Sequence, residues 1–355
     1  MAGDYTRAVR AAVDSVQEMV PALLFLCAGV PLAALLDRLG FFDALASRIE
    51  ARFAELPVAV LWWLAAATTA VLNLDTTIVL LTPLYVRLAR RAGVDPLRLA
   101  LVPLLLAAFA SSVLPVSNLT TLIAAERFDL ATGDVLARLG PVSLVACVVG
   151  WIAYRRRHPA TIAGGVPAQV DRRALTVGGL VVVGLLAGFV VGPARGVEAW
   201  AVVLAADLVL VVVTRHVPWR EVPVATALGV AAVGGLVGLV VPADALRSVL
   251  DADQPLAVGG LVLAGAGAAN ALNNLPALLA ATASATDMTP GMWAWLAGTN
   301  TGSVLLPLGA LANILWWRII RDEGLALDLR GYVRAVAPVA APALLAAALT
   351  LAVLG

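Results

Sequence analysis

Two apolar regions of the chain are interrupted by polar residues, the first by Val71-Leu72-Asn73-Leu74-Asp75-Thr76-Thr77 and the second by Asn270-Ala271-Leu272-Asn273-Asn274-Leu275-Pro276. Each interruption is followed by another broken apolar segment, at residues 111–118 and 298–307. In lipid an unpaired backbone polar group costs several kcal/mol, so irregular backbone persists only inside protein or beside a water-filled cavity. Corresponding breaks in two halves of a membrane chain point to the substrate site of a transporter.

The composition around these breaks is that of a membrane protein. Of the 355 residues, 61% are hydrophobic and 13% are charged, whereas a soluble domain carries about 25% charged residues. The formal net charge of +1 gives no sign of a nucleic-acid partner. Two cysteines, Cys27 and Cys147, lie in apolar stretches, where free cysteine behaves as a small buried hydrophobe. The sequence therefore predicts neither a disulfide framework nor a metal site.

The order of apolar segments predicts an all-α polytopic membrane protein with two repeats. Each repeat contains a span, a surface helix (residues 38–56 in the first repeat), a re-entrant helical hairpin, a broken transmembrane helix and a final span. The arms around residues 73–77 are short for spans of about 20 residues, which favours a re-entrant hairpin. We expect a first repeat at 1–157, shortened at its N-terminus, with hairpin tip 73–77 and helix break 111–118; a cytoplasmic linker at 158–173; and a second repeat at 174–355 with tip 273–276 and break 298–307.

The distribution of arginine predicts the orientation. All 24 basic residues are Arg, and 18 of them fall in segments that lie on one side if the hairpins do not cross the membrane. The positive-inside rule places that side in the cytoplasm. The first hairpin then opens inward and the second outward, so the repeats are inverted. The C-terminus lies outside the inner membrane. The Arg-rich segments are 38–56, 87–98, 155–173, 215–220 and 318–334.

Asp75 is the only acidic residue within the four breaks. A charge in the bilayer interior is expensive and is by default a functional hypothesis. We therefore expect Asp75 to bind the coupling proton or cation, although it could also serve as the N-cap of a helix that starts at Thr76. Asp207, in the middle of a later span, is a secondary candidate for proton relay; the alternative is a structural hydrogen bond to a neighbouring helix.

Neutral hydroxyl and amide side chains gather at the same breaks. They suit a polar solute held at the ends of half-helices; the alternative is repair of helix kinks, which is common in membrane helices. No Arg occurs within residues 99–126 or 248–317, so an anion would have no fixed cation beside it. This favours an uncharged or cationic substrate. The candidate substrate residues are Asn73, Thr76, Thr77, Ser117, Asn118, Asn273, Asn274, Thr299, Asn300 and Thr301.

Four motifs occur in order along the chain: Leu72-Asn73-Leu74-Asp75 followed by Leu81-Thr82-Pro83, Leu114-Pro115-Val116-Ser117-Asn118-Leu119, Leu272-Asn273-Asn274-Leu275-Pro276, and Pro307-Leu308-Gly309-Ala310-Leu311-Ala312. They resemble motifs of the arsenite/antimonite efflux permeases, which belong to the ion transporter superfamily together with the divalent anion:sodium symporters. The resemblance covers about residues 18–355. Three departures stand out: Ser111-Ser112 and Asn300 occupy positions where the permeases carry an acid, and the Asn-Asp pair is spread to Asn73-Leu74-Asp75.

The resemblance implies a secondary transporter rather than an enzyme, and we expect proton-coupled efflux of arsenite or antimonite. The alternatives are a sodium-coupled symporter of di- and tricarboxylates or inorganic anions, with Asn118 and Asn300 near sodium sites, and a sodium/proton antiporter. A receptor or scaffold that does not transport is disfavoured by the polar breaks in both halves. We expect no cofactor beyond the coupling proton or sodium, contacts with membrane lipid and a homodimer, and leave open an ATPase partner.

Overall fold

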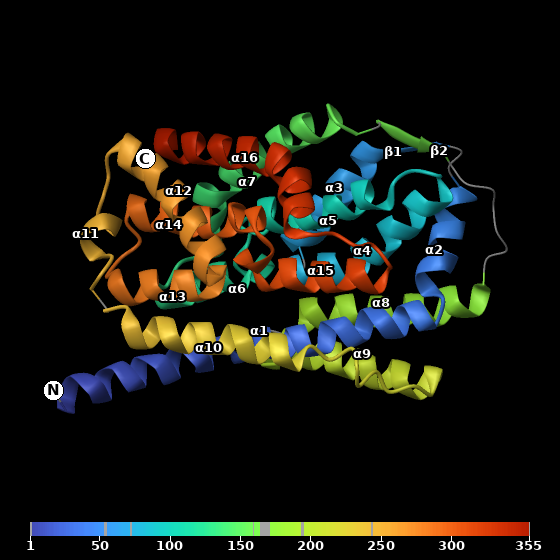
Figure 1. The fold of residues 1–355 in the computed structure, drawn as a ribbon, viewed down its shortest axis with the longest axis horizontal. Coiled ribbons are helices and arrows are strands. Elements are labelled where there is room, and N and C mark those ends of the chain that lie inside the picture. The colour runs from blue at the N-terminus through green and yellow to red at the C-terminus, as the bar shows by residue number, and fades with distance from the viewer. Residues whose placement is uncertain are drawn as a thin grey trace.

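The computed structural model describes residues 2–52, 55–71, 73–158, 160–163, 171–192, 195–242 and 244–354. It confirms the predicted helical architecture, in which helices run along the long axis of the molecule (Figure 1). In the first half the helices are α1 (Ala2–Arg38), α2 (Phe41–Glu50), α3 (Val58–Val71), α4 (Leu74–Arg91), α5 (Pro96–Phe109), α6 (Leu119–Arg127) and α7 (Thr132–Arg155). In the second half they are α8 (Arg172–Val191), α9 (Ala199–Thr214), α10 (Val224–Val240), α11 (Arg247–Leu250), α12 (Pro255–Leu272), α13 (Asn274–Ser284), α14 (Pro290–Thr301), α15 (Leu311–Asp322) and α16 (Leu329–Leu354).

Among the described residues, five helices are long and apolar enough to cross a membrane: Ala12–Arg38, Thr132–Arg155, Arg172–Phe189, Pro255–Leu272 and Leu329–Leu354. The protein is therefore a multi-pass membrane protein. The 14 residues of α3 are too few for a span, as expected. The 18 residues of α12 reach the lower limit of a span, so length alone does not make the second hairpin re-entrant.

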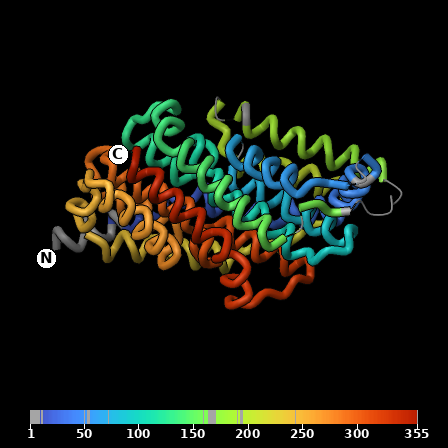
Figure 2. The backbone as a smooth tube through the Cα atoms, turned by 90° about the horizontal axis from the view of Figure 1, so that it is seen from above, coloured from blue at the N-terminus to red at the C-terminus, as the bar shows by residue number. Residues whose placement is uncertain are grey.

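The two hairpins lie in opposite halves of the long axis. In Figure 1, α3 and α4 lie toward the end that carries α2, whereas α12 and α13 lie toward the end that carries α11 and both termini. The last helices of the two halves, α7 and α16, pack side by side (Figures 1 and 2). They run antiparallel, because Arg138 near the start of α7 donates to the carbonyl oxygen of Leu354 at the end of α16, at 3.0 Å.

The first half differs locally from the prediction. The expected surface helix over residues 38–56 is shorter: α1 continues to Arg38, Gly40 turns with a φ of 80°, and α2 occupies only Phe41–Glu50. The positive φ at Gly40 stops the helix and is readily adopted by glycine. Residues 55–57 instead form β1 (Glu55–Pro57), which pairs antiparallel with β2 (Thr161–Ala163) from the predicted linker. Part of that linker, residues 159 and 164–170, lies outside the described residues.

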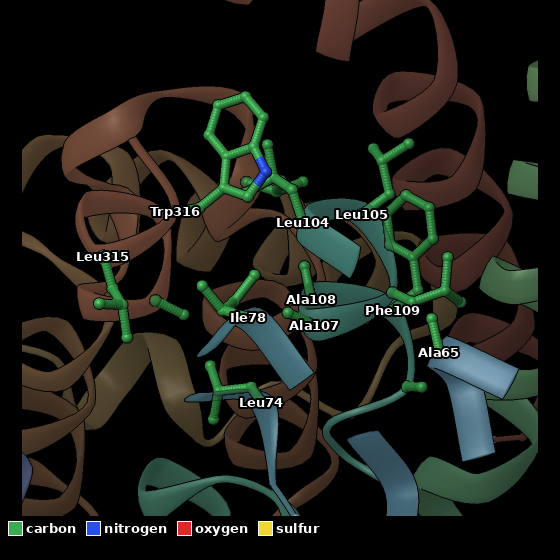
Figure 3. Close-up of a cluster of buried hydrophobic side chains, with 14 of the residues drawn as sticks. Ala65, Leu74, Ile78, Leu104, Leu105, Ala107, Ala108, Phe109, Leu315 and Trp316 are labelled. Carbon is green, nitrogen blue, oxygen red and sulfur yellow. The ribbon is translucent and has the colours of Figure 1, made fainter. Parts of the chain in front are cut away.

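The core joins the two halves around the first hairpin (Figure 3). Ile78 of α4 and Phe109 of α5 are fully buried there, and Trp316 of α15 lies in the same cluster. The indole nitrogen of Trp316 donates to the carbonyl oxygen of Ala100 at 2.7 Å, so this aromatic side chain also has its polar group satisfied. The half-helix α15 from the second half is thus fixed against α5 from the first.

Backbones approach most closely between α12 and α14. A Cβ at Gly298 would collide with the carbonyl of Val262, and one at Gly302 would collide with Ala266. Small residues let membrane helices pack at short distance. This contact holds the first arm of the second hairpin against the second broken helix.

Candidate functional site

The tip of the first hairpin is shaped by Asn73, which links α3 to α4. Its backbone is extended, and its Oδ1 accepts a hydrogen bond from the backbone N–H of Thr76 at 2.7 Å. Asn73 is therefore the N-cap of α4, which begins at Leu74. The alternative prediction that Asp75 caps a helix starting at Thr76 is wrong, because the helix starts earlier and the cap position is already taken.

Asp75 sits in the first turn of α4, half-buried, where the helix dipole favours a negative charge. Within the described part of the chain its carboxylate has neither a hydrogen bond nor an ion pair. The neighbouring hydroxyl of Thr76 is buried and also lacks a partner among those residues. Thr77 differs, because it donates to the carbonyl oxygen of Asn73 at 3.1 Å and accepts from Thr69 at 2.9 Å.

Most polar groups of the first helix break form hydrogen bonds with other groups of the same break. Between α5 and α6 the chain forms the short 3₁₀ helix η1 (Pro115–Ser117). The hydroxyl of Ser117 donates to the carbonyl oxygens of Ser111 and Leu114, at 2.6 and 2.5 Å. Asn118 caps α6 through Thr120 and donates from Nδ2 to the Ser111 hydroxyl at 3.1 Å. Ser117 and Asn118 thus satisfy backbone groups released by the break, which is the kink-repair alternative.

The second hairpin tip is tied to the second break. Asn273 has a φ of 84° and caps α13, and its Nδ2 donates to the carbonyl oxygen of Leu308 at 2.9 Å. Leu308 belongs to the 3₁₀ helix η4 (Pro307–Gly309), which follows η3 (Ser303–Leu305) within the break. The next candidate, Asn274, is buried at the start of α13.

Asn270 and Asn313 are functional candidates that the sequence reasoning missed. Asn270 donates to the carbonyl oxygen of Gly302 at 2.8 Å and accepts from the backbone N–H of Leu306 at 2.6 Å. Asn313 donates to the carbonyl oxygens of Ser303 and Leu306 at 2.9 and 3.1 Å. The signal was present, because each is an amide within one turn of a break in an apolar segment, and such an amide needs a partner.

Asn300 connects the two broken helices. Its Nδ2 donates to the hydroxyls of Ser112 and Thr121, both at 2.9 Å, and its Oδ1 accepts from Thr120 at 2.6 Å. All four side chains are buried. Ser112 and Asn300, one from each half, thus bind each other through neutral side chains.

The remaining candidates in α14 are two threonines, both buried. The hydroxyl of Thr299 donates to the carbonyl oxygen of Leu296 in its own helix at 3.0 Å. The hydroxyl of Thr301 is without a partner among the described residues. Buried polar groups are almost always paired, and among the described residues the hydroxyls of Thr76, Thr82, Ser143 and Thr301 are buried without a partner; Thr76 and Thr301 are the two that the sequence predicted as substrate residues.

A cavity of about 1060 Å³ reaches the tip of the first hairpin at Asn73. Its walls come from the start of α1, the ends of α8 and α10, the start of α9, and α6 and α13, and its lining includes Val116 from the first break. Among the described residues, the lining contains four acids and one base: Asp14, Glu18, Glu126, Glu198 and Arg127.

Asp207 does not join this site. It is buried in α9, which packs against α1 and α8, and its Oδ1 lacks a hydrogen-bond partner within the described residues. The predicted structural hydrogen bond to a neighbouring helix is therefore not found there.

Residues 8–301 match the CitMHS family, which is described as a citrate transporter family. The chain belongs to this family. It is accordingly a membrane transporter, as the resemblance to the ion transporter superfamily predicted.

Similar individual proteins carry a different name. The arsenical pump membrane protein of Yersinia enterocolitica is 26% identical to this CitMHS chain over 342 residues, which cover 85% of the chain and 79% of the relative. The arsenical pump membrane protein of Escherichia coli (strain K12) is 25% identical over 340 residues, with the same coverage of both proteins. The family description thus names citrate, whereas the names of these relatives refer to arsenicals.

Proposed function

We propose that this CitMHS protein is a proton-coupled exporter of arsenite or antimonite across the inner membrane. Arsenite and antimonite are largely neutral hydroxides at neutral pH, so hydroxyl and amide groups suffice to bind them. The free hydroxyls of Thr76 and Thr301 and the cavity-lining amide of Asn73 are groups of this kind. Asp75 carries the proton in this proposal.

The charge of the cavity lining and of the helix breaks is the main observation in support of the proposal. The ionisable lining of the cavity has four acids against one Arg, and no Arg occurs at either helix break. Two unit charges 4 Å apart repel by about 1 kcal/mol in bulk water and by more beside protein. A trianion such as citrate would meet several such repulsions in the lining, whereas a neutral hydroxide meets none. A cleft lined by one sign of charge selects against solutes of that sign.

The alternative is a sodium-coupled symporter of citrate or a related anion, which the family description favours. Purified protein in proteoliposomes would distinguish the two, with arsenite, antimonite and citrate offered separately, with and without sodium, under an imposed pH gradient. We expect arsenite or antimonite uptake that follows the pH gradient and is unchanged without sodium. Sodium-dependent citrate uptake would overturn the proposal.

We further propose that the two halves are inverted repeats with re-entrant hairpins. The antiparallel contact of α7 with α16 and the placement of the hairpins in opposite halves of the molecule support this arrangement. The excess of Arg at the α2 end supports a cytoplasmic location for that end and an external C-terminus.

A further inference from the structure

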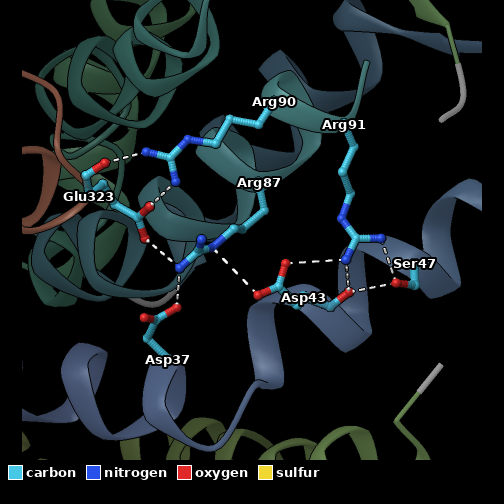
Figure 4. A network of polar contacts seen from close by, with 7 residues as sticks. All are labelled: Asp37, Asp43, Ser47, Arg87, Arg90, Arg91 and Glu323. Atoms are coloured by element: carbon cyan, nitrogen blue, oxygen red, sulfur yellow. Dashed lines mark hydrogen bonds and ion pairs between the residues drawn. The ribbon is translucent and has the colours of Figure 1, made fainter. Parts of the chain in front are cut away.

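A cluster of charged side chains surrounds the C-terminal end of α4 (Figure 4). Arg87 lies at its centre. Its Nη2 is 2.6 Å from Asp37 Oδ1 and 3.3 Å from Glu323 Oε1, and its Nε is 3.9 Å from Asp43 Oδ2. We call the cluster the α4 charge network; its members are Asp37, Asp43, Ser47, Arg87, Arg90, Arg91 and Glu323.

Glu323 is the most enclosed of the charged members, with 7% of its side chain exposed. It binds two arginines at once: Arg87, and Arg90 through Nη1 at 2.6 Å, with a second Arg90 hydrogen bond to the backbone carbonyl of Glu323. One turn beyond Arg87 on α4, Arg91 donates to the Ser47 hydroxyl at 2.6 Å. Isolated exposed ion pairs contribute little, but a shared and largely buried carboxylate makes removal of one partner costly.

The α4 charge network joins elements from different parts of the fold. Asp37 lies at the end of α1, Asp43 in α2, and Glu323 at the end of α15 from the second half. Asp75 lies on the same helix as Arg87, about 18 Å away at 1.5 Å per residue. Because α4 is continuous between them, the tip of the hairpin cannot be displaced far without moving Arg87.

The cavity lies toward the opposite end of the molecule. Asp14 and Glu18 line it from the start of α1, whereas Asp37 lies near the end of that helix, about 35 Å from Asp14 at 1.5 Å per residue. One end therefore holds the cavity and the other end holds the ion pairs.

We propose that the α4 charge network is a latch that keeps its end of the transporter closed while the cavity at the opposite end is open. The latch breaks when the site turns to face the other side. This inference rests on the proposed role of the breaks as a transport site with alternating access. It assigns Arg87 and Glu323 to control of conformation rather than to substrate binding.

The test uses thiol accessibility in the full-length protein in detergent, with Cys27 and Cys147 replaced by serine. Ala89→Cys reports on the latched end, where Ala89 is fully buried. Val116→Cys reports on the cavity, where Val116 is 50% exposed. The rate of reaction with a polar maleimide is measured at each position, with and without Glu323→Gln.

Glu323→Gln should speed the reaction at position 89 by about tenfold, which corresponds to about 1.4 kcal/mol, and slow it at position 116. Asp322→Asn is the matched control, because Asp322 pairs only within its own helix, with Arg318 at 4.0 Å, and should change neither rate. Should Glu323→Gln fail to fold, Asp37→Asn removes a single partner of Arg87, and Arg87→Lys should retain the wild-type rates.

Unchanged rates at both positions in folded Glu323→Gln and Asp37→Asn would overturn the latch. Faster reaction at both positions would also overturn it, because that result means general loosening rather than a shift between two states. Neither result bears on which solute is carried, since no transport is measured.

Discussion

At the scale of single residues, Asp75 is distinguished by what it lacks: its neighbour Asn73 performs the capping, and no described residue pairs with its carboxylate. Asp75→Asn should abolish uptake driven by a pH gradient while leaving the thermal midpoint of the protein unchanged. Asp207→Asn is the matched control, because it neutralises a buried carboxylate away from the breaks and should retain coupling. Coupled uptake by the Asp75→Asn protein would exclude this role.

Asn300 has structural partners that the sequence did not predict, while its role in substrate binding stays a prediction. The sequence predicts it at a helix break, and the structure shows its amide bound to three hydroxyls of the first half. Asn300→Ala should destabilise the protein by about 1–3 kcal/mol for each buried group left unpaired. Thr299→Val, in the adjacent position with a bond only to its own helix, should have a much smaller effect on the thermal midpoint. Equal thermal midpoints for the two variants would contradict a stabilising role for the hydrogen bonds of Asn300.

At the scale of elements, the contact of α12 with α14 depends on glycine. Gly298→Ala should destabilise the protein by about 1–3 kcal/mol, since overpacking forces the two backbones apart. Gly267→Ala, on α12 with nothing within 4 Å of its added Cβ, should be neutral or slightly stabilising. Thermal unfolding of both variants in the same detergent checks this. A destabilised Gly267→Ala would mean that the helix itself, and not the contact, is sensitive.

The breaks between elements were predictable because polar residues that interrupt an apolar run can be seen in the sequence, without knowledge of the contacts they make in the fold. The tips at residues 73 and 273 and the breaks near residues 111 and 302 follow from this rule alone. The pairing of β1 with β2 could not be predicted, because it joins short segments more than 100 residues apart that carry no alternating pattern. The hydrogen bonds of Asn270 could not be predicted from the sequence for a related reason, since its partners are backbone groups of another element.

At the scale of the whole molecule, the hairpins lie toward opposite ends, and the ends differ in charge. The end with α2 and the α4 charge network holds most of the Arg, whereas the end with α11 and the termini holds the acidic lining of the cavity. The positive-inside rule predicts that the first of these ends is cytoplasmic. In that orientation we expect the cavity on the external side of the membrane.

This orientation predicts which loops react from each side of the membrane. Arg98→Cys, exposed at the start of α5 near the base of the first hairpin, should react only with reagent on the cytoplasmic face. Gln254→Cys, exposed at the start of α12, should react only from outside. Intact cells and inverted vesicles treated with an impermeant maleimide provide the two faces. If both positions react from one face, α5 and α12 begin on the same side, the halves are not inverted, and the tips at Asn73 and Asn273 do not approach a common site from opposite sides.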